Sequence, residues 1–147
     1  MKIRYATKYD AQKIINMLWN YHDSGTIEGL SVADEKTALK ILTHILAGAG
    51  IAILAEKNNE PVGMLLAFKV PFLWDHNKFV MNEIAYWVEE EHRGSTAGYR
   101  LLAEYVKYCE QLKEENMITN YTLSQMEGQN LNYSRFGFKP IEHTWSI

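Results

Sequence analysis

Cysteine is almost absent from this sequence of 147 residues. The one residue present, Cys109, excludes an internal disulfide and a metal site built from several cysteines. Its place among apolar helical residues predicts a buried structural thiol. Long apolar runs are also missing, because none approaches the roughly 20 residues that a membrane-spanning helix requires. The N-terminus has no hydrophobic signal core, so we expect a cytoplasmic protein without a membrane partner.

The sequence also lacks an excess of positive charge. The formal net charge is -3 at pH 7, and the sequence pI is about 5.9. This balance argues against a protein that grips nucleic acid mainly through its phosphates, so we expect no nucleic-acid partner. The His, Asp and Glu residues show no convincing metal-ligand spacing, and we predict no metal.

The rest of the composition is typical of a soluble globular protein. Hydrophobic residues make up 47% of the chain and charged residues 22%, which is close to the average for such proteins. A chain of this length can bury a sizeable core and usually forms one domain. We therefore expect a single domain over residues 1–147.

Hydrophobic periodicity and turn residues predict the order of the elements. We expect a first helix that Thr7 caps, a second helix over 33–47, a third from Ala97 to about Glu115, and a short one over 130–136. Strands are expected over 3–5, 51–55, 61–70, 79–88, 118–123 and 138–147. Loops are expected over 22–31 and 71–78, and these would hold His22 and His76.

This order predicts an α/β (α+β) fold with one mixed sheet. Consecutive strands without an intervening helix form an antiparallel meander, whereas the later strand–helix–strand unit implies a parallel pair. The sheet is therefore expected to be mostly antiparallel, with one parallel pair and with helices on both faces. A doubly wound nucleotide-binding fold is excluded.

An anion site is predicted where the strand 79–88 gives way to the third helix. Residues 93–98 read Arg-Gly-Ser-Thr-Ala-Gly, a turn with little side-chain bulk. The free N–H groups at the start of a helix attract anions, and Arg93 adds a positive charge. A P-loop and a dinucleotide fingerprint are both excluded, since neither Gly-Lys-Ser/Thr nor Gly-x-Gly-x-x-Gly occurs here. Taken alone, the segment fits an ordinary tight glycine turn equally well.

A second motif lies near the C-terminus, where Tyr133 is followed by Gly137 and Phe138. Together the two motifs resemble the GNAT superfamily of N-acetyltransferases. That family has Arg-Gly-x-Gly-x-Gly/Ala after a strand ending in Val, and Val88 stands five residues before Arg93. It also has Tyr-x-x-x-Gly-Phe near its C-terminus. The expected order of elements agrees with the family over essentially the whole chain.

Two positions depart from the family pattern. Thr96 stands where the phosphate segment has its middle glycine, which narrows the backbone approach but offers a hydroxyl. Met126 stands where the family often has Asn, and Asn130 lies nearby but out of register. These changes leave the coenzyme prediction in place and affect the expected contacts to the pantetheine arm.

The resemblance implies a GNAT-like fold in which acetyl-CoA, the cosubstrate, lies between two splayed parallel strands. It implies direct transfer of the acetyl group to a primary amine of a small molecule or protein. Tyr133 takes the position of the family's general acid, and Glu83 that of a base used by some members. The coenzyme-binding residues it implies are Tyr86, Trp87, Val88, Arg93, Gly94, Ser95, Thr96, Ala97, Gly98, Tyr99 and Asn130.

Two classes of function stay open at this point. An enzyme is favoured by Tyr133 in register, whereas the uncertain base leaves room for a non-catalytic acyl-CoA-binding or protein-interaction module. The acceptor amine is not identified, and the loops 22–32 and 70–78 are expected to shape its pocket. Phe72 and Trp74 could form one wall of that pocket or, equally well, the surface of a homodimer.

Overall fold

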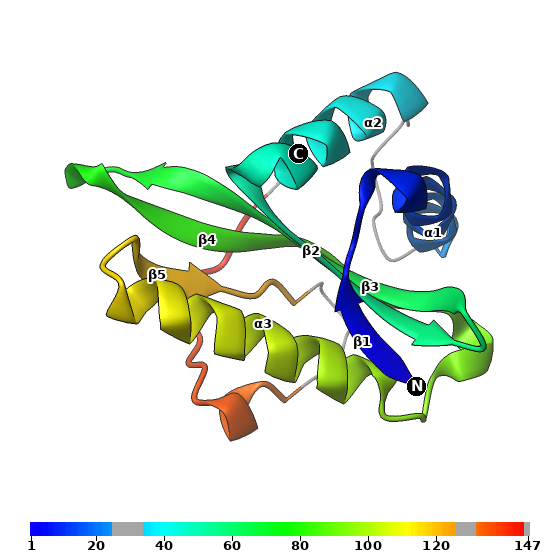
Figure 1. The fold of residues 1–147 in the computed structure, drawn as a ribbon. Helices are drawn as coiled ribbons and strands as arrows, with labels where there is room; N and C mark the ends of the chain where they lie inside the picture. Colours follow the sequence, from blue (N-terminus) through cyan, green and yellow to red (C-terminus); the bar gives the residue numbers. More distant parts are fainter. Residues whose placement is uncertain (25–33, 126–131, 146–147) are drawn as a thin grey trace.

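One sheet forms the centre of the molecule in the computed structural model, which describes residues 1–24, 34–125 and 132–145. Its strands follow one another in chain order, as Figure 1 shows. They are β1 (Lys2–Tyr5), β2 (Gly50–Lys57), β3 (Glu60–Phe72), β4 (Asp75–Val88) and β5 (Ile118–Thr122). The first four pair antiparallel and β4 pairs parallel with β5. The predicted mixed, mostly antiparallel fold is confirmed.

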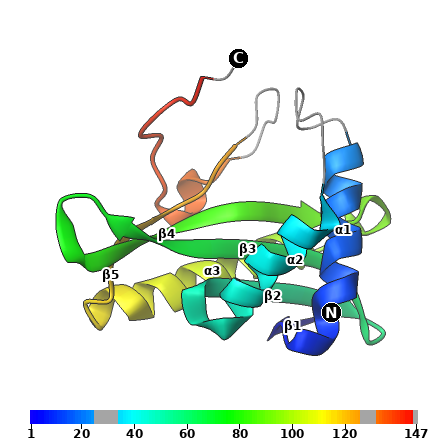
Figure 2. The same cartoon turned by 90° about the horizontal axis from the view of Figure 1, so that it is seen from above.

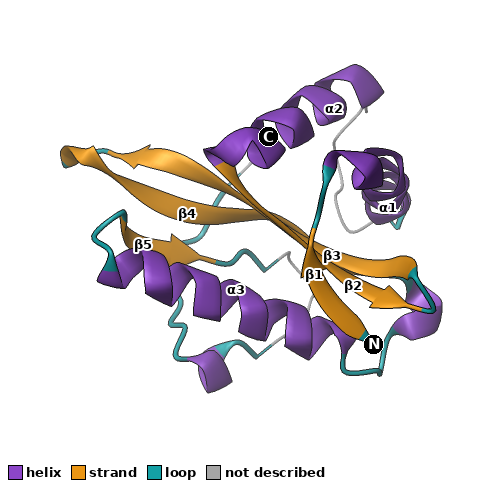
Figure 3. Cartoon of the chain, in the orientation of Figure 1, coloured by secondary structure: helices purple, strands orange, loops and turns teal. Residues whose placement is uncertain are grey.

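Helices cover both faces of this sheet. On one face lie α1 (Ala11–Asp23) and α2 (Glu35–His44), and on the other lies α3 (Ala97–Glu114) (Figures 2 and 3). Two separate cores result, one under α3 with Leu101 and Tyr105, the other under α1 and α2 with Ile14 and Leu42. Cys109 is fully buried in the first core, as predicted. No helix in the described parts of the chain is long and apolar enough to cross a bilayer.

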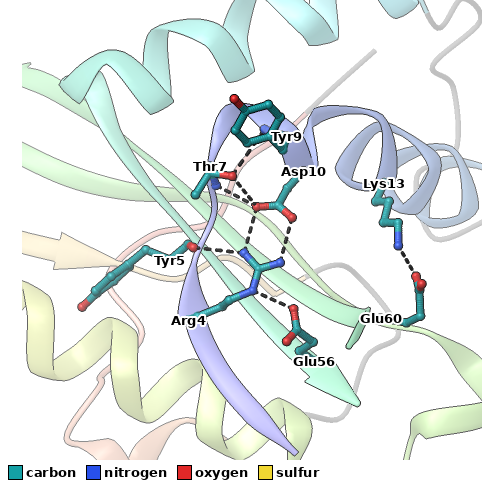
Figure 4. A network of polar contacts seen from close by, with 8 residues as sticks. All are labelled: Arg4, Tyr5, Thr7, Tyr9, Asp10, Lys13, Glu56 and Glu60. Carbon is teal, nitrogen blue, oxygen red and sulfur yellow. Dashed lines mark hydrogen bonds and ion pairs between the residues drawn. The ribbon is translucent and has the colours of Figure 1, made fainter. Parts of the chain in front are cut away.

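The predicted cap at Thr7 is present, and an ion cluster around Arg4 supports it. Thr7 accepts from the amide of Tyr9, and its own amide donates to Asp10, which closes a capping box over the 3-10 turn Lys8–Asp10 before α1. Arg4 on β1 donates to Asp10 from Nη1 and Nη2, each at 2.8 Å, and to Glu56 on β2 from Nε at 2.6 Å (Figure 4). The start of α1 is thereby fastened to two strands of the sheet.

A bulge changes the direction of the side chains along β4. Leu66 of β3 pairs with Ala85 while its neighbour Ala67 pairs with Glu83, so Ile84 is the extra residue. Before the bulge, Met81 belongs to the core under α3. After it, Ala85 and Trp87 belong to the core under α1 and α2. The bulge lies where β4 reaches the end of its pairing with β5.

The loop expected over 71–78 is instead a tight hairpin. β3 continues to Phe72 and β4 begins at Asp75, with Pro71 opposite Phe79. Pro, Asp, Asn and Lys have low strand propensity, but antiparallel pairing with β3 overrides it. His76 therefore lies on a strand, and Trp74 is exposed at the hairpin tip.

The expected strand over 138–147 is also wrong for the residues described. Residues 138–145 form no strand, and Ile141 and Trp145 are 73% and 92% exposed. Pro140 removes a backbone donor from this segment, and Phe138 packs edge-on against Tyr121 instead of extending a ladder. The short helix expected over 130–136 is reduced to the 3-10 turn Ser134–Phe136, and its first two positions lie outside the described residues.

Candidate active site

Glu83 lies at the point where β4 and β5 separate. Their last paired residues are Asn82 and Thr122, whose side chains share a hydrogen bond of 2.9 Å, although β4 continues to Val88. The carboxylate of Glu83 accepts from the amide of Ser124 at 3.1 Å, just beyond the end of β5. Glu83 is 8% exposed, and burial raises its pKa to about 7 against the opposing effect of the Ser124 bond.

Several tyrosines lie within electrostatic range of this carboxylate. Burial raises the pKa of Tyr133, and charges on Tyr86, Glu83 and Tyr21 raise it further, which places all four groups within electrostatic range. Burial also raises the pKa of Tyr86 to about 12. The structure thus brings together the sequence-predicted residues Glu83, Tyr86 and Tyr133. Tyr21 was missed, because on an amphipathic helix it is indistinguishable from a core residue.

The predicted anion segment has the backbone geometry of an anion site. Gly94 has φ +82°, a left-handed conformation that favours glycine. The hydroxyl of Ser95 accepts from the amide of Ala97. Among the described residues, the amides of Thr96, Gly98 and Tyr99 meet no acceptor, and the first turn of α3 carries no acidic side chain. These free donors and the helix dipole make the segment attractive to a phosphate.

Arg93 is held at the entrance to this segment. Its Nε donates to the carbonyl of Val88 at 3.0 Å, and its guanidinium lies over the ring of Trp87 at 4.4 Å from the centroid. The stacking holds the guanidinium over Trp87 without using its remaining donors. Trp87 itself packs toward Tyr21, with ring centroids 5.5 Å apart. Its side chain therefore lies on the α1 and α2 face of the sheet.

The structure gives Gly98 a packing role in addition to the predicted opening for a ligand. A Cβ at this position would lie 3.0 Å from the hydroxyl of Tyr86, and that hydroxyl donates to the Gly98 carbonyl at 2.7 Å. Glycine therefore lets the first turn of α3 sit directly on β4. Tyr86 in turn ties the anion segment to the strand that carries Glu83.

The other predicted positions are more dispersed. Tyr99 is 65% exposed and packs against Phe136, with centroids 5.2 Å apart, which connects α3 to the C-terminal motif. Glu89, which is not one of the predicted residues, accepts from Asn20 of α1 at 2.9 Å. Asn130 lies outside the described residues, so its predicted contact stays a prediction. In the described part of the chain, no three His, Cys, Asp or Glu side chains gather as metal ligands would.

A cavity of about 390 Å³ lies on the face of the sheet opposite α3, between α1, α2 and β4. Its lining includes Trp19, Tyr21 and His22 of α1, Ala38 and Ile41 of α2, and the bulge residue Ile84. His22, expected in a loop, is in the last turn of α1. Phe72 and Trp74 do not contribute to this cavity.

Comparison with known proteins assigns the fold and the family. Residues 12–138 match the acetyltransferase (GNAT) family, so the chain belongs to this family and the resemblance seen in the sequence is confirmed. Comparison with curated proteins finds no relative.

Several solved structures are similar over nearly the whole chain. A predicted acetyltransferase from Clostridium acetobutylicum, crystallised with acetyl-CoA, has a TM-score of 0.78 at 17% identity, covering 99% of this chain and 94% of that one. An aminoglycoside acetyltransferase from an uncultured soil metagenomic sample, in complex with sisomicin, scores 0.70 at 15% identity over 99% and 95%. A ribosomal-protein-alanine N-acetyltransferase from Brucella melitensis biovar Abortus 2308 scores 0.67 at 17% identity over 99% and 94%. At such identities these structures support the fold alone.

Proposed function

We propose that this protein transfers an acetyl group from acetyl-CoA to a primary amine. The observation that carries the proposal is the position of Glu83 where β4 and β5 separate, on the strand that leads to the anion segment. From Glu83 to Val88 the strand covers roughly 17 Å at about 3.4 Å per residue. An extended pantetheine arm suits that span, with the diphosphate at the free amides of α3 and the thioester near Glu83.

Two side chains can carry the protons of this reaction. The amine nitrogen attacks the thioester carbonyl carbon, the new C–N bond forms, and the C–S bond breaks. Glu83, held by Ser124 and with a pKa near 7, accepts the proton that the amine releases, either directly or through water. Tyr133, whose raised pKa keeps it protonated, donates a proton to the departing thiolate. The products are the amide and the free thiol of coenzyme A.

The fold does not select the acceptor. The similar structures include an aminoglycoside acetyltransferase and a ribosomal-protein-alanine N-acetyltransferase, two names that denote very different amines. The proposed function is therefore tested first at the donor. Titration calorimetry should show binding of acetyl-CoA, and a panel of primary amines should include some that release free thiol.

The Tyr133→Phe variant tests the assignment of the acid. Removing the phenol hydroxyl should lower kcat about 100-fold, the usual scale of a lost general acid, and change acetyl-CoA affinity less than about threefold. Tyr108→Phe, at a half-buried tyrosine of α3 whose ring lies beside Tyr5, is the matched control and should keep wild-type turnover.

The outcomes separate the competing readings. Equal turnover in Tyr133→Phe and wild type would remove Tyr133 from the mechanism. Binding of acetyl-CoA without thiol release from any amine would indicate a non-catalytic acyl-CoA-binding module. Failure to bind acetyl-CoA would contradict the proposed function altogether.

A further inference from the structure

We propose that the cavity between α1, α2 and β4 binds the non-reacting part of the acceptor, and that this part is an aromatic ring carrying a hydrogen-bond donor. The acceptor is then an arylalkylamine of the hydroxyphenyl-ethylamine type and not a polycation. This inference rests on the proposed acetyl transfer, because it names the amine that the same site uses.

The size and lining of the cavity favour a single apolar ring system. A volume of about 390 Å³ is within the range of small-molecule sites, which is roughly 300–1,000 Å³. The walls are hydrophobic and aromatic, and they include the buried residues Ile15 and Leu42 and the ring of Trp19. Burying an aromatic ring against such walls is favourable, whereas a chain of ammonium groups would lose its hydration there.

One buried polar atom of a lining residue has no hydrogen-bond partner in the described part of the chain. The Nε2 atom of His22 is buried and makes no hydrogen bond within the described residues. The other ring nitrogen, Nδ1, lies 3.0 Å from a carboxylate oxygen of Asp23. That contact favours the tautomer with the proton on Nδ1, which leaves Nε2 as an acceptor. A ligand with an O–H or N–H donor on its ring would satisfy this atom.

The cavity adjoins the proposed reaction centre. Ile84, which lines the cavity, is the bulge residue next to Glu83 in the chain. Tyr21 lines it as well, and the charge of Glu83 contributes to the raised pKa of Tyr21. A ring in the cavity can therefore extend a short arm past Ile84 and place its amine near Glu83.

The described lining of the cavity carries too little negative charge to bind a polycation. Asp34 is the one carboxylate among the described lining residues. It caps α2, and its oxygens already accept from Thr37 and from the amide of Lys36. Recognition of several ammonium groups would require several free carboxylates. A monoamine satisfies the site with the charges that are present.

Steady-state kinetics with three probe amines test the proposal in the full chain. With acetyl-CoA saturating, kcat/KM for tyramine should exceed that for spermidine at least tenfold. It should exceed that for 2-phenylethylamine, which lacks the hydroxyl, about tenfold, because the buried Nε2 is then left without a partner. In His22→Phe, the difference between tyramine and 2-phenylethylamine should disappear.

Filling the cavity tests its location. Ala38→Phe places a ring in the cavity from α2 and should raise KM for tyramine at least tenfold, with acetyl-CoA affinity unchanged. Leu39→Phe adds a ring at the next position of the same helix, which is 44% exposed and does not line the cavity, and should behave as wild type. Unchanged acetyl-CoA binding by calorimetry shows that each variant is folded.

The results distinguish this inference from the proposed function. Binding of acetyl-CoA together with preferred use of spermidine, or an unchanged KM for tyramine in Ala38→Phe, would overturn the acceptor assignment and leave acetyl transfer in place. Absence of acetyl-CoA binding in the wild type would overturn both.

Discussion

At the scale of single residues, burial gives Glu83 the properties that the proposed proton transfer requires. Glu83 lies just past the last β4–β5 pair, where β4 still pairs with β3, and its side chain is buried. Ser124 supplies a backbone donor that holds the ionised form, but desolvation outweighs this bond and the pKa rises to about 7. A base with this pKa is half ionised near neutral pH, which suits general base catalysis.

The pH dependence of turnover should report this residue. Glu83 must be ionised to accept a proton, so kcat should rise with pH through about 7 and level off above it. In Glu83→Gln the break near pH 7 should vanish and kcat should fall about 100-fold. Glu89→Gln is the control and should keep the break. Glu89 also precedes the anion segment in the chain, but its carboxylate accepts a hydrogen bond from Asn20. Persistence of the break in Glu83→Gln would assign it to another group.

Glu83→Gln should lower kcat but should raise the stability of the fold at high pH. The pKa of Glu83 is raised on folding from 4.5 to about 7, so the folded state binds more protons between these values. Stability from this group is therefore present at low pH and is lost as pH rises toward 7. Glu83→Gln, which stays neutral, should be more stable than wild type at pH 8 and similar at pH 4 by urea unfolding.

At the scale of elements, the junction of β4 and α3 carries most of the proposed coenzyme site. The bulge at Ile84 turns Ala85 and Trp87 toward α1, and it places Tyr86 under the start of α3. Tyr86 and Gly98 then fix the first turn of the helix against the strand. The free amides of that turn are thereby held at a defined position relative to the strand that bears Glu83.

A branched side chain at position 98 should disturb this junction. In Gly98→Val the new Cβ would lie 3.0 Å from the Tyr86 hydroxyl, so the helix turn or the tyrosine must move. We expect at least a tenfold loss of acetyl-CoA affinity by calorimetry with the fold retained by circular dichroism. Lys107→Val, on the exposed side of the same helix, controls for lower helix propensity. Wild-type affinity in Gly98→Val would contradict the placement of the diphosphate.

At the scale of the whole molecule, one ion cluster joins parts of the chain that are distant in sequence. Arg4 of β1 binds Asp10 before α1 and Glu56 of β2, and both carboxylates are largely buried (Figure 4). The Arg4 guanidinium lowers the pKa of Asp10 from 3.8 to about 2. Because the folded-state pKa is lowered, the stabilisation is present above about pH 4 and is lost as pH falls toward 2.

Arg4→Met should therefore weaken the whole fold and shift acid unfolding to higher pH. It leaves two carboxylates without a cation, which should lower the free energy of unfolding at pH 7 by about 2–3 kcal/mol. Lys13→Met is the matched control, because its ion pair with Glu60 is exposed and contributes less than about 1 kcal/mol. Urea unfolding at pH 7 and pH 3 measures both, and the wild-type advantage over Arg4→Met should shrink at the lower pH. Equal stability of the two variants would show that the cluster contributes little.

The sequence was sufficient for features that depend on neighbouring residues. Periodicity placed the three long helices and most of the sheet, and Thr7 marked the first cap. The anion site over residues 93–98 stays a prediction. The predictions of a loop over 71–78 and of a strand from residue 138 were wrong, although they used the same kind of local pattern. In both, strand formation depends on whether a partner strand is present in register, and local composition does not contain that information.

The tertiary structure decided the chemistry of the site. The sequence determined that Glu83, Tyr133 and a glycine-containing turn before α3 exist on this chain, and its motifs indicated the GNAT family. Only the folded sheet shows that Glu83 lies where β4 and β5 part, and that Tyr21 and His22 line a cavity between α1, α2 and β4. The physical reason is that burial and proximity, which set a pKa and enclose a ligand, arise between residues far apart in sequence.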